Sequence, residues 1–113
     1  MKKNLTYQKA MSFAIRIVNV YKFLTEEKAE RVMSKQLLRS GTLIGANFSE
    51  SLSAESDSDF IHKLAICQKE ANETLFWLAA TLPVIDSISP NPKFAKTASA
   101  SNALLKFVAL MAL

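Results

Sequence analysis

QLLRSGTLIGANFSE, residues 36–50, is the stretch that decides the fold, because its apolar side chains recur at the spacing of a helix. That spacing places Leu37 and Ile44 on one stripe of an α-helix. Gly41 and Gly45 lie in the same stretch, and each weakens a helix by roughly 1 kcal/mol relative to alanine. Since a missing side chain lets a neighbouring helix approach, the two glycines predict a close contact between helices.

This helix is predicted to run from Thr25 to about Ser51. Thr25 is a suitable N-cap, and Glu26 and Glu27 in the first turn are favoured by the helix dipole. The apolar seam of this helix is expected at Met33, Leu37, Ile44 and Phe48.

Residues 52–57 are predicted to form a turn, followed by a helix over residues 58–82. Ser56 and Asp59 resemble a capping box with aspartate in place of glutamate. Pro83 is expected to end or kink this helix. Its apolar positions are Phe60, Leu64, Cys67, Ala71, Leu75, Leu78 and Leu82.

Two further helices flank these. One is predicted over residues 6–24 with Thr6 as its N-cap, and another begins at Asn91, a suitable cap, with Pro92 in the first helical position. Short connections between long helices favour antiparallel neighbours. The sequence therefore predicts an all-α, up-down-up-down antiparallel four-helix bundle that forms a single domain over residues 1–113. The apolar positions are Ala10, Phe13, Ala14, Ile17, Val18, Val20, Tyr21 and Leu24 in the first helix, and Phe94, Ala98, Leu105 and Val108 in the last.

Composition narrows the classes of protein that remain. The chain has 113 residues, half of them apolar, with only 2 Gly and 3 Pro, which argues against disorder and against a β-sandwich with many turns. One cysteine, Cys67, excludes an internal disulfide and a multi-cysteine metal site. We find no signal-peptide pattern and no apolar run long enough to span a membrane, so we expect a cytoplasmic protein.

A polar stripe accompanies the apolar seam of the two central helices. If the connecting turn is centred near residue 54 or 55, Arg39 lies level with Glu70, and Gln36 with Glu73. The same register places Asn47 level with His62, and a shift of a few residues would bring Arg39 to Glu73 instead. The stripe comprises Gln36, Arg39 or Ser40, Leu43, Asn47 and Glu50 in one helix and Glu70 and Glu73, followed by Trp77, in the next.

Two interpretations of the stripe compete: a hydrogen-bonded network that fixes the register of the helices, and an active site of paired carboxylates. A di-iron bundle requires two Glu-x-x-His motifs, whereas Asp59-x-x-His62 is the one similar element here. We therefore expect no metal, no cofactor and no catalytic residue. If a carboxylate partner stays buried, Arg39→Ala should destabilise the protein by on the order of 3 kcal/mol.

Positive charge is concentrated in the first part of the chain. Residues 1–39 contain nine Lys and Arg residues and three acidic residues. The net charge of the whole chain is +4. Two stripes of cations are expected to merge into one ridge, which is either a solvated charged face or a track for a phosphate backbone. The candidate nucleic-acid-binding residues are Lys9, Arg16, Lys28, Arg31 and Lys35.

Two segments resemble a bacterial family of small four-helix-bundle proteins, some of which are encoded in intervening sequences of large-subunit ribosomal RNA genes. The first is residues 36–50, with its spacing of Gln, Arg-Ser, Asn and Glu. The second is DFIHKLAICQKEANETLFWL, residues 59–78, with Lys-Glu-Ala-x-Glu and then Trp-Leu; the opening Tyr7-Gln8-Lys9-Ala10 is also similar. The resemblance covers roughly residues 5–82, and the proline-containing C-terminal third departs from it.

The resemblance implies an up-and-down four-helix bundle that assembles into rings of five subunits. Accessory proteins of diversity-generating retroelements also resemble this family, and they use a basic ring surface to bind nucleic acid and a reverse transcriptase. The motif residues are interpreted as structural. We therefore expect a non-enzymatic homo-oligomer that acts as an accessory protein, either by binding RNA or DNA or as a scaffold. The alternative is a protein-interaction module with an unknown partner and no role with nucleic acid.

Overall fold

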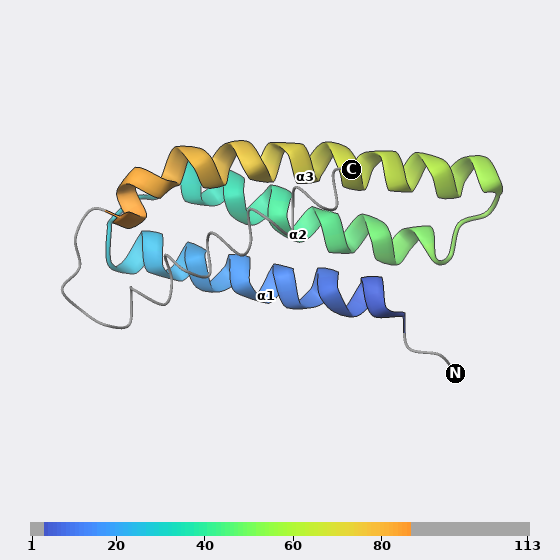
Figure 1. The fold of residues 1–113 in the computed structure, drawn as a ribbon, viewed down its shortest axis with the longest axis horizontal. Coiled ribbons are helices and arrows are strands. Elements are labelled where there is room, and N and C mark those ends of the chain that lie inside the picture. Colours follow the sequence, from blue (N-terminus) through green and yellow to red (C-terminus); the bar gives the residue numbers. More distant parts are fainter. Residues whose placement is uncertain (1–3, 87–113) are drawn as a thin grey trace.

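A computed structural model of the chain describes residues 4–86, which form three antiparallel helices (Figure 1). They are α1 (Leu5–Glu26), α2 (Met33–Ser51) and α3 (Asp57–Asp86). The part of the chain that is described is therefore all-α. The predicted fourth helix, from Asn91, lies outside the described residues.

The start of α1 is capped by a different side chain from the one that was predicted. Asn4 is the N-cap, and its Oδ1 accepts a hydrogen bond of 3.0 Å from the Tyr7 N–H. The assignment of Thr6 as the cap was therefore wrong, because Asn4 satisfies a free amide one turn earlier.

The connection between α1 and α2 differs from the prediction. Thr25 does not cap α2: its hydroxyl donates to the Tyr21 carbonyl within α1, at 2.9 Å. α2 instead begins at Met33, and the carboxylate of Glu30 accepts hydrogen bonds from the backbone N–H groups of residues 32–34, at 2.8–2.9 Å. Ala29 adopts a positive φ of 53° to make this turn. One glutamate thus satisfies three of the free amides that a helix start leaves.

The second connection follows the prediction closely, and α3 begins at Asp57. Ser56 Oγ accepts a hydrogen bond of 3.0 Å from the Asp59 N–H, as in a capping box. The reciprocal bond is displaced by one residue, since Asp59 Oδ2 accepts from the Glu55 N–H at 3.2 Å.

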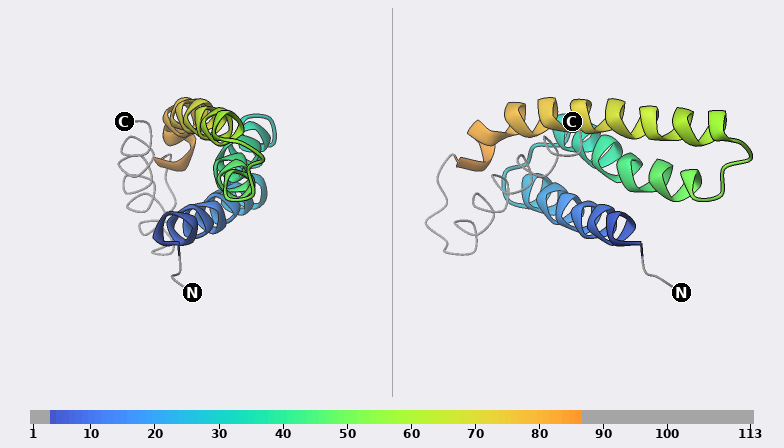
Figure 2. Two further views of the ribbon diagram at one scale, coloured as in Figure 1. Left: turned by 90° about the vertical axis from the view of Figure 1, so that its right-hand side faces the viewer. Right: turned by 45° about the vertical axis from the view of Figure 1, so that its right-hand side comes forward.

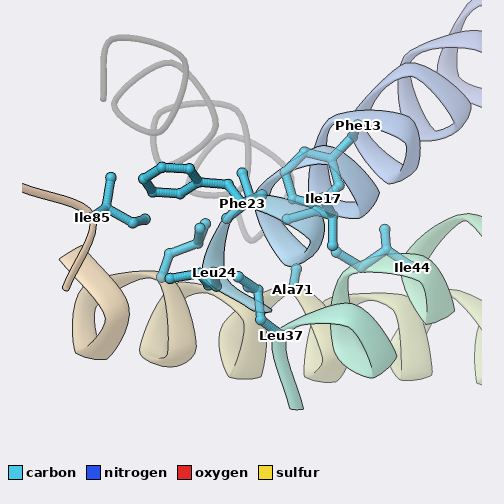
Figure 3. Close-up of a cluster of buried hydrophobic side chains, with 10 residues drawn as sticks. Phe13, Ile17, Phe23, Leu24, Leu37, Ile44, Ala71 and Ile85 are labelled. Carbon is cyan, nitrogen blue, oxygen red and sulfur yellow. The ribbon is translucent and has the colours of Figure 1, made fainter. Parts of the chain in front are cut away.

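Pro83 does not end α3, which continues to Asp86. The last turn leans toward the end of α1 (Figure 1). Ile85 is buried there in the same cluster as Phe23 and Leu24 (Figure 3). Apolar burial therefore holds the helix together beyond a residue that removes one of its hydrogen bonds.

α2 is the central helix of the three and packs against both α1 and α3 (Figure 2). Leu37 and Ile44 of the predicted seam are fully buried, but Phe60 of α3 is exposed. The other buried positions of α2 include small polar residues that hydrophobic periodicity does not detect. The core cluster consists of Phe13, Ile17, Val20, Phe23, Leu24, Leu37, Ile44, Ala71, Leu78 and Ile85.

The predicted role of the glycines is confirmed at Gly41. A Cβ on this residue would lie 2.8 Å from both Cγ1 and Cγ2 of Ile17, which is fully buried. A Cβ on Gly45 would meet Ala10 at 3.5–3.7 Å, which is ordinary contact. The close approach of α1 to α2 therefore requires glycine at residue 41 alone.

Within residues 4–86, no helix combines the length and the apolar character that crossing a lipid bilayer requires.

We predict opposite effects for alanine at the two glycines. Gly41→Ala should lower the free energy of unfolding by about 1–3 kcal/mol, because the new methyl group overlaps Ile17. Gly45→Ala is the matched control and should raise it by up to about 1 kcal/mol through helix propensity. Denaturant unfolding followed by circular dichroism would measure both, and equal effects would contradict the assigned contact.

We also predict that Glu30→Ala lowers stability by about 1 kcal/mol at neutral pH, since it removes the cap of α2. Burial by itself raises the pKa of Glu30. The hydrogen bonds from the N–H groups of Met33, Ser34 and Val32 together lower the pKa by more, so the pKa of Glu30 is below its usual value. The stabilisation is therefore complete above the pKa of Glu30 in the unfolded chain. It is lost as pH falls through the lower pKa of the folded state.

Thermal melts at several pH values should show the difference between wild type and Glu30→Ala shrinking in acid. Glu27→Ala, an exposed residue of the same connection, is the control and should change stability by less than about 0.5 kcal/mol. A difference that persists at low pH would contradict capping by the Glu30 carboxylate.

Candidate functional site

A polar cluster joins α2 to α3 at the predicted position. Arg39 extends from α2 and pairs with both carboxylates of α3: its Nη2 donates to Glu73 Oε1, and its Nη1 lies 3.5 Å from Glu70 Oε2. Gln36, one turn before Arg39, accepts from the Arg39 Nε at 3.4 Å. The network interpretation is thus supported by direct contacts across the two helices.

Two aromatic residues extend this cluster along α3. The indole Nε1–H of Trp77 donates to Glu73 Oε1 at 3.4 Å. The ring of Phe76 lies edge-on to Trp77, with centroids 5.0 Å apart and an interplanar angle of 82°. Trp77 is half-buried, whereas Phe76 is exposed.

The cluster is less buried than the sequence-based prediction assumed. The side chain of Arg39 is 44% exposed and that of Glu73 34%, while that of Glu70 is only 9% exposed. Burial therefore raises the pKa of Glu70, although Arg39 acts in the opposite direction. The hydrogen bond from Arg39 lowers the pKa of Glu73, and the same bond raises the pKa of the guanidinium.

The register of α2 against α3 is shifted from the predicted one. Glu50 pairs with Lys63 at 2.8 Å, and the Cys67 thiol donates to the Ile44 carbonyl at 3.4 Å, so level pairs centre near residue 56. Asn47 donates to the Leu43 carbonyl of its own helix at 2.8 Å, not to His62. The turn is centred later because Leu52 to Ala54 still bond back to the end of α2.

A buried contact beneath the cluster was not predicted from the sequence. The Thr74 hydroxyl lies 2.9 Å from Ser40 Oγ and also donates to the Glu70 carbonyl at 2.7 Å. Both residues are fully buried. Ser40 follows Met33 by seven residues, and Thr74 follows Cys67 by seven. Because Met33 and Cys67 belong to the predicted apolar seams, this spacing could have indicated that Ser40 and Thr74 are buried.

The chemistry that this site offers is structural pairing. Arg39 lies between the two carboxylates that an acid–base mechanism would need, and it holds Glu73 ionised. Among residues 4–86, no group of three or more His, Cys, Asp or Glu is placed to hold a metal ion. Burial raises the pKa of the Cys67 thiol, which favours its unreactive protonated form.

The cations of the predicted ridge fall on different sides of the α1–α2 pair. Lys9 and Arg16 directly precede Ala10 and Ile17, the residues that face α2. Successive helical residues point about 100° apart, so both cations lie on one flank of α1. Lys35 shares a side of α2 with Thr42, seven residues on, and Thr42 lines a groove on the other flank.

The remaining two cations lie in the connection between α1 and α2. The Lys28 ammonium is 6.0 Å from the centroid of the Phe23 ring, and Arg31 is exposed. The expected single ridge is therefore not formed by these five residues, because a helix pair separates Lys9 and Arg16 from Lys35. Within the described part of the chain, Lys9, Arg16 and Lys35 make no ion pair.

The groove lies between the first half of α1 and the second half of α2 and has a volume of about 280 Å³. Most of its lining side chains are small, and Met11 among them is exposed. The groove was not predicted from the sequence. Its lining residues are Tyr7, Ala10, Met11, Ala14, Thr42, Gly45, Ala46 and Ser49.

Comparison with known proteins shows a family and a solved structure to which the chain is similar. The model of the family described as 23S rRNA-intervening sequence protein matches residues 2–102. A crystal structure of a protein with unknown function from the S23 ribosomal protein family of Bacteroides thetaiotaomicron VPI-5482 is 44% identical, with a TM-score of 0.73. The similarity covers 96% of this chain and 98% of that one. None of the curated proteins matches.

We predict that Arg39→Ala lowers stability by about 1 kcal/mol, near the upper limit for exposed ion pairs, because water screens this half-exposed group. This replaces the larger sequence-based expectation of a buried pair. Without Arg39, the pKa of the buried Glu70 rises further. The deficit should therefore shrink as pH falls and both carboxylates become protonated.

Lys35→Ala, one turn earlier on α2, is the matched control, since Lys35 is exposed and has no ion-pair partner among the described residues. Chemical denaturation at pH 7 and pH 4 would measure both variants. Equal stability of Arg39→Ala and wild type at pH 7 would show that the cluster does not hold α2 to α3.

Proposed function

The chain belongs to the 23S rRNA-intervening sequence protein family, and on that premise we propose that it is a non-enzymatic, homo-oligomeric accessory protein that binds nucleic acid. One observation carries this proposal: residues 5–25 and 33–49 contain five cations and no acidic residue, and four of the five, all but Arg39, make no ion pair within residues 4–86. Cations that make no ion pair remain available to phosphate groups.

Binding of this kind would depend on charge and not on base sequence. Lys9 and Arg16 on one flank, and Lys35 on the other, are exposed and make no ion pair within residues 4–86. Such residues neutralise phosphates and release counterions, which gives a strong dependence on salt. The acidic residues Glu26, Glu27 and Glu30 confine this region to the bodies of the helices.

Self-association is supported by exposed apolar side chains on α3. Phe60, Ile61 and Phe76 are 39%, 65% and 62% exposed, so α3 presents apolar area that a second subunit could cover. We propose the ring of five subunits that the family resemblance implies. A ring would repeat the net charge of +4 on each subunit and turn weak contacts into a strong combined one.

We also propose that the predicted helix from Asn91 completes a four-helix bundle. α2 packs against both α1 and α3, which leaves the side between α1 and α3 open to a fourth element. An up-down-up-down connection would place the last helix there. Lys9 and Arg16 share a side of α1 with the buried Phe23, so in this arrangement they would lie at the edge of the contact with the last helix.

The second candidate function is a protein-interaction module with no role with nucleic acid. The apolar groove between α1 and α2 favours it, because phosphate groups gain nothing from an apolar surface.

Binding to labelled RNA and duplex DNA across a salt series, with native mass recorded on the same sample, tests the proposal. We expect an oligomer whose log affinity falls linearly with log salt. Lys9→Ala combined with Arg16→Ala should reduce the slope by about one unit for each phosphate that is no longer neutralised. Lys69→Ala, an exposed cation of α3, is the control with an unchanged slope. Absence of binding at about 50 mM salt would refute nucleic-acid binding.

A further inference from the structure

The flank of the α1–α2 pair that contains the groove continues into two lysines, and we call this surface the groove face: the groove residues, Ile15, Lys22 and Lys35. Lys22 follows Met11 by eleven residues, which is three helical turns on the same side of α1. Lys35 precedes Thr42 by seven residues and Ala46 by eleven, which places it on the groove side of α2.

The two lysines lie at the same level along the bundle. Gly41 of α2 lies beside Ile17 of α1. Lys35 precedes Gly41 by six residues and Lys22 follows Ile17 by five, so both lysines lie toward the same end of this antiparallel pair. Both are exposed, and neither makes an ion pair within the described residues. One end of the groove face is therefore apolar, and the other is cationic.

We propose that the groove face docks an amphipathic helix of another protein, whose large apolar side chains enter the groove and whose carboxylates lie over Lys22 and Lys35. This deepens the protein-interaction candidate and does not require nucleic-acid binding. Ala14 and Lys22 are eight residues apart, about 12 Å along α1. The partner helix therefore carries its acidic residues about two turns from its apolar anchors.

The chemistry of the groove face selects this occupant. Ala14, Gly45 and Ala46 leave room above the buried Ala10 for large apolar side chains, and the partly exposed Met11 adds an adaptable contact. Complementary charge favours acid on the partner, because Lys22 and Lys35 make no ion pair within the described residues, although Glu26 follows Lys22 by one helical turn. The same surface of a second copy would place cation against cation.

The test uses the full chain and a designed peptide of about five helical turns, with leucines on one face at one end and glutamates two turns away. A second peptide carries lysines in place of the glutamates. Titration calorimetry should show saturable binding of the first peptide and at least about tenfold weaker binding of the second. Lys22→Glu combined with Lys35→Glu should reverse that preference, which a merely structural effect would not do.

The groove end is tested by Ala46→Lys, which places a long charged side chain at an exposed position of the groove. It should abolish peptide binding, while the control Lys69→Glu on α3 should leave binding unchanged. Circular dichroism of each variant would confirm that its helices are intact.

Equal binding of both peptides, or no binding of either, would overturn the docking proposal. Release of subunits by Ala46→Lys, seen in the native mass, would assign the face to a second copy and would also overturn it. Salt-dependent binding of RNA or DNA is measured separately. Failure of docking therefore leaves the nucleic-acid proposal standing, and failure of the latter leaves docking standing.

Discussion

α2 is packed on two sides, and the small side chains at its buried positions make both contacts possible. Toward α1, Gly41 lets the backbone of α2 approach the branched side chain of Ile17. Toward α3, Ser40 lies against Thr74 in a fully buried contact. A larger residue at either position would push one neighbouring helix away, because a close-packed interior does not absorb extra volume without strain.

The buried hydroxyl groups of this interface cost little because their own helices satisfy them. Thr74 donates to the Glu70 carbonyl one turn earlier, and Thr81 does the same with Trp77. Ser51 bonds to the Phe48 carbonyl. Within the described residues, no buried side-chain nitrogen or oxygen lacks a hydrogen-bond partner. The helices can therefore bring polar positions together without a network that depends on exact alignment.

The helices and the Arg39 cluster were predictable because they rest on periodicity and on opposite charges at matching heights. The start of α2 was not, since Thr25 and Glu30 are both plausible in a first turn. What decided between them was the turn that Ala29 makes in a conformation that favours glycine. The burial of Ser40 against Thr74 was not predicted, because hydrophobic patterns do not register small polar residues. The groove depends on how two helices meet, and a single helix pattern does not contain that information.

The indole of Trp77 gives the molecule a built-in optical reporter. It is the single tryptophan of the chain, it is half-buried, and its N–H contacts the carboxylate of Glu73 at the junction of α2 and α3. Tryptophan emission from this protein therefore comes from one defined place. Its wavelength will register the polarity and ionisation around Glu73, and a spectral change will report events at that junction, not an average over the whole chain.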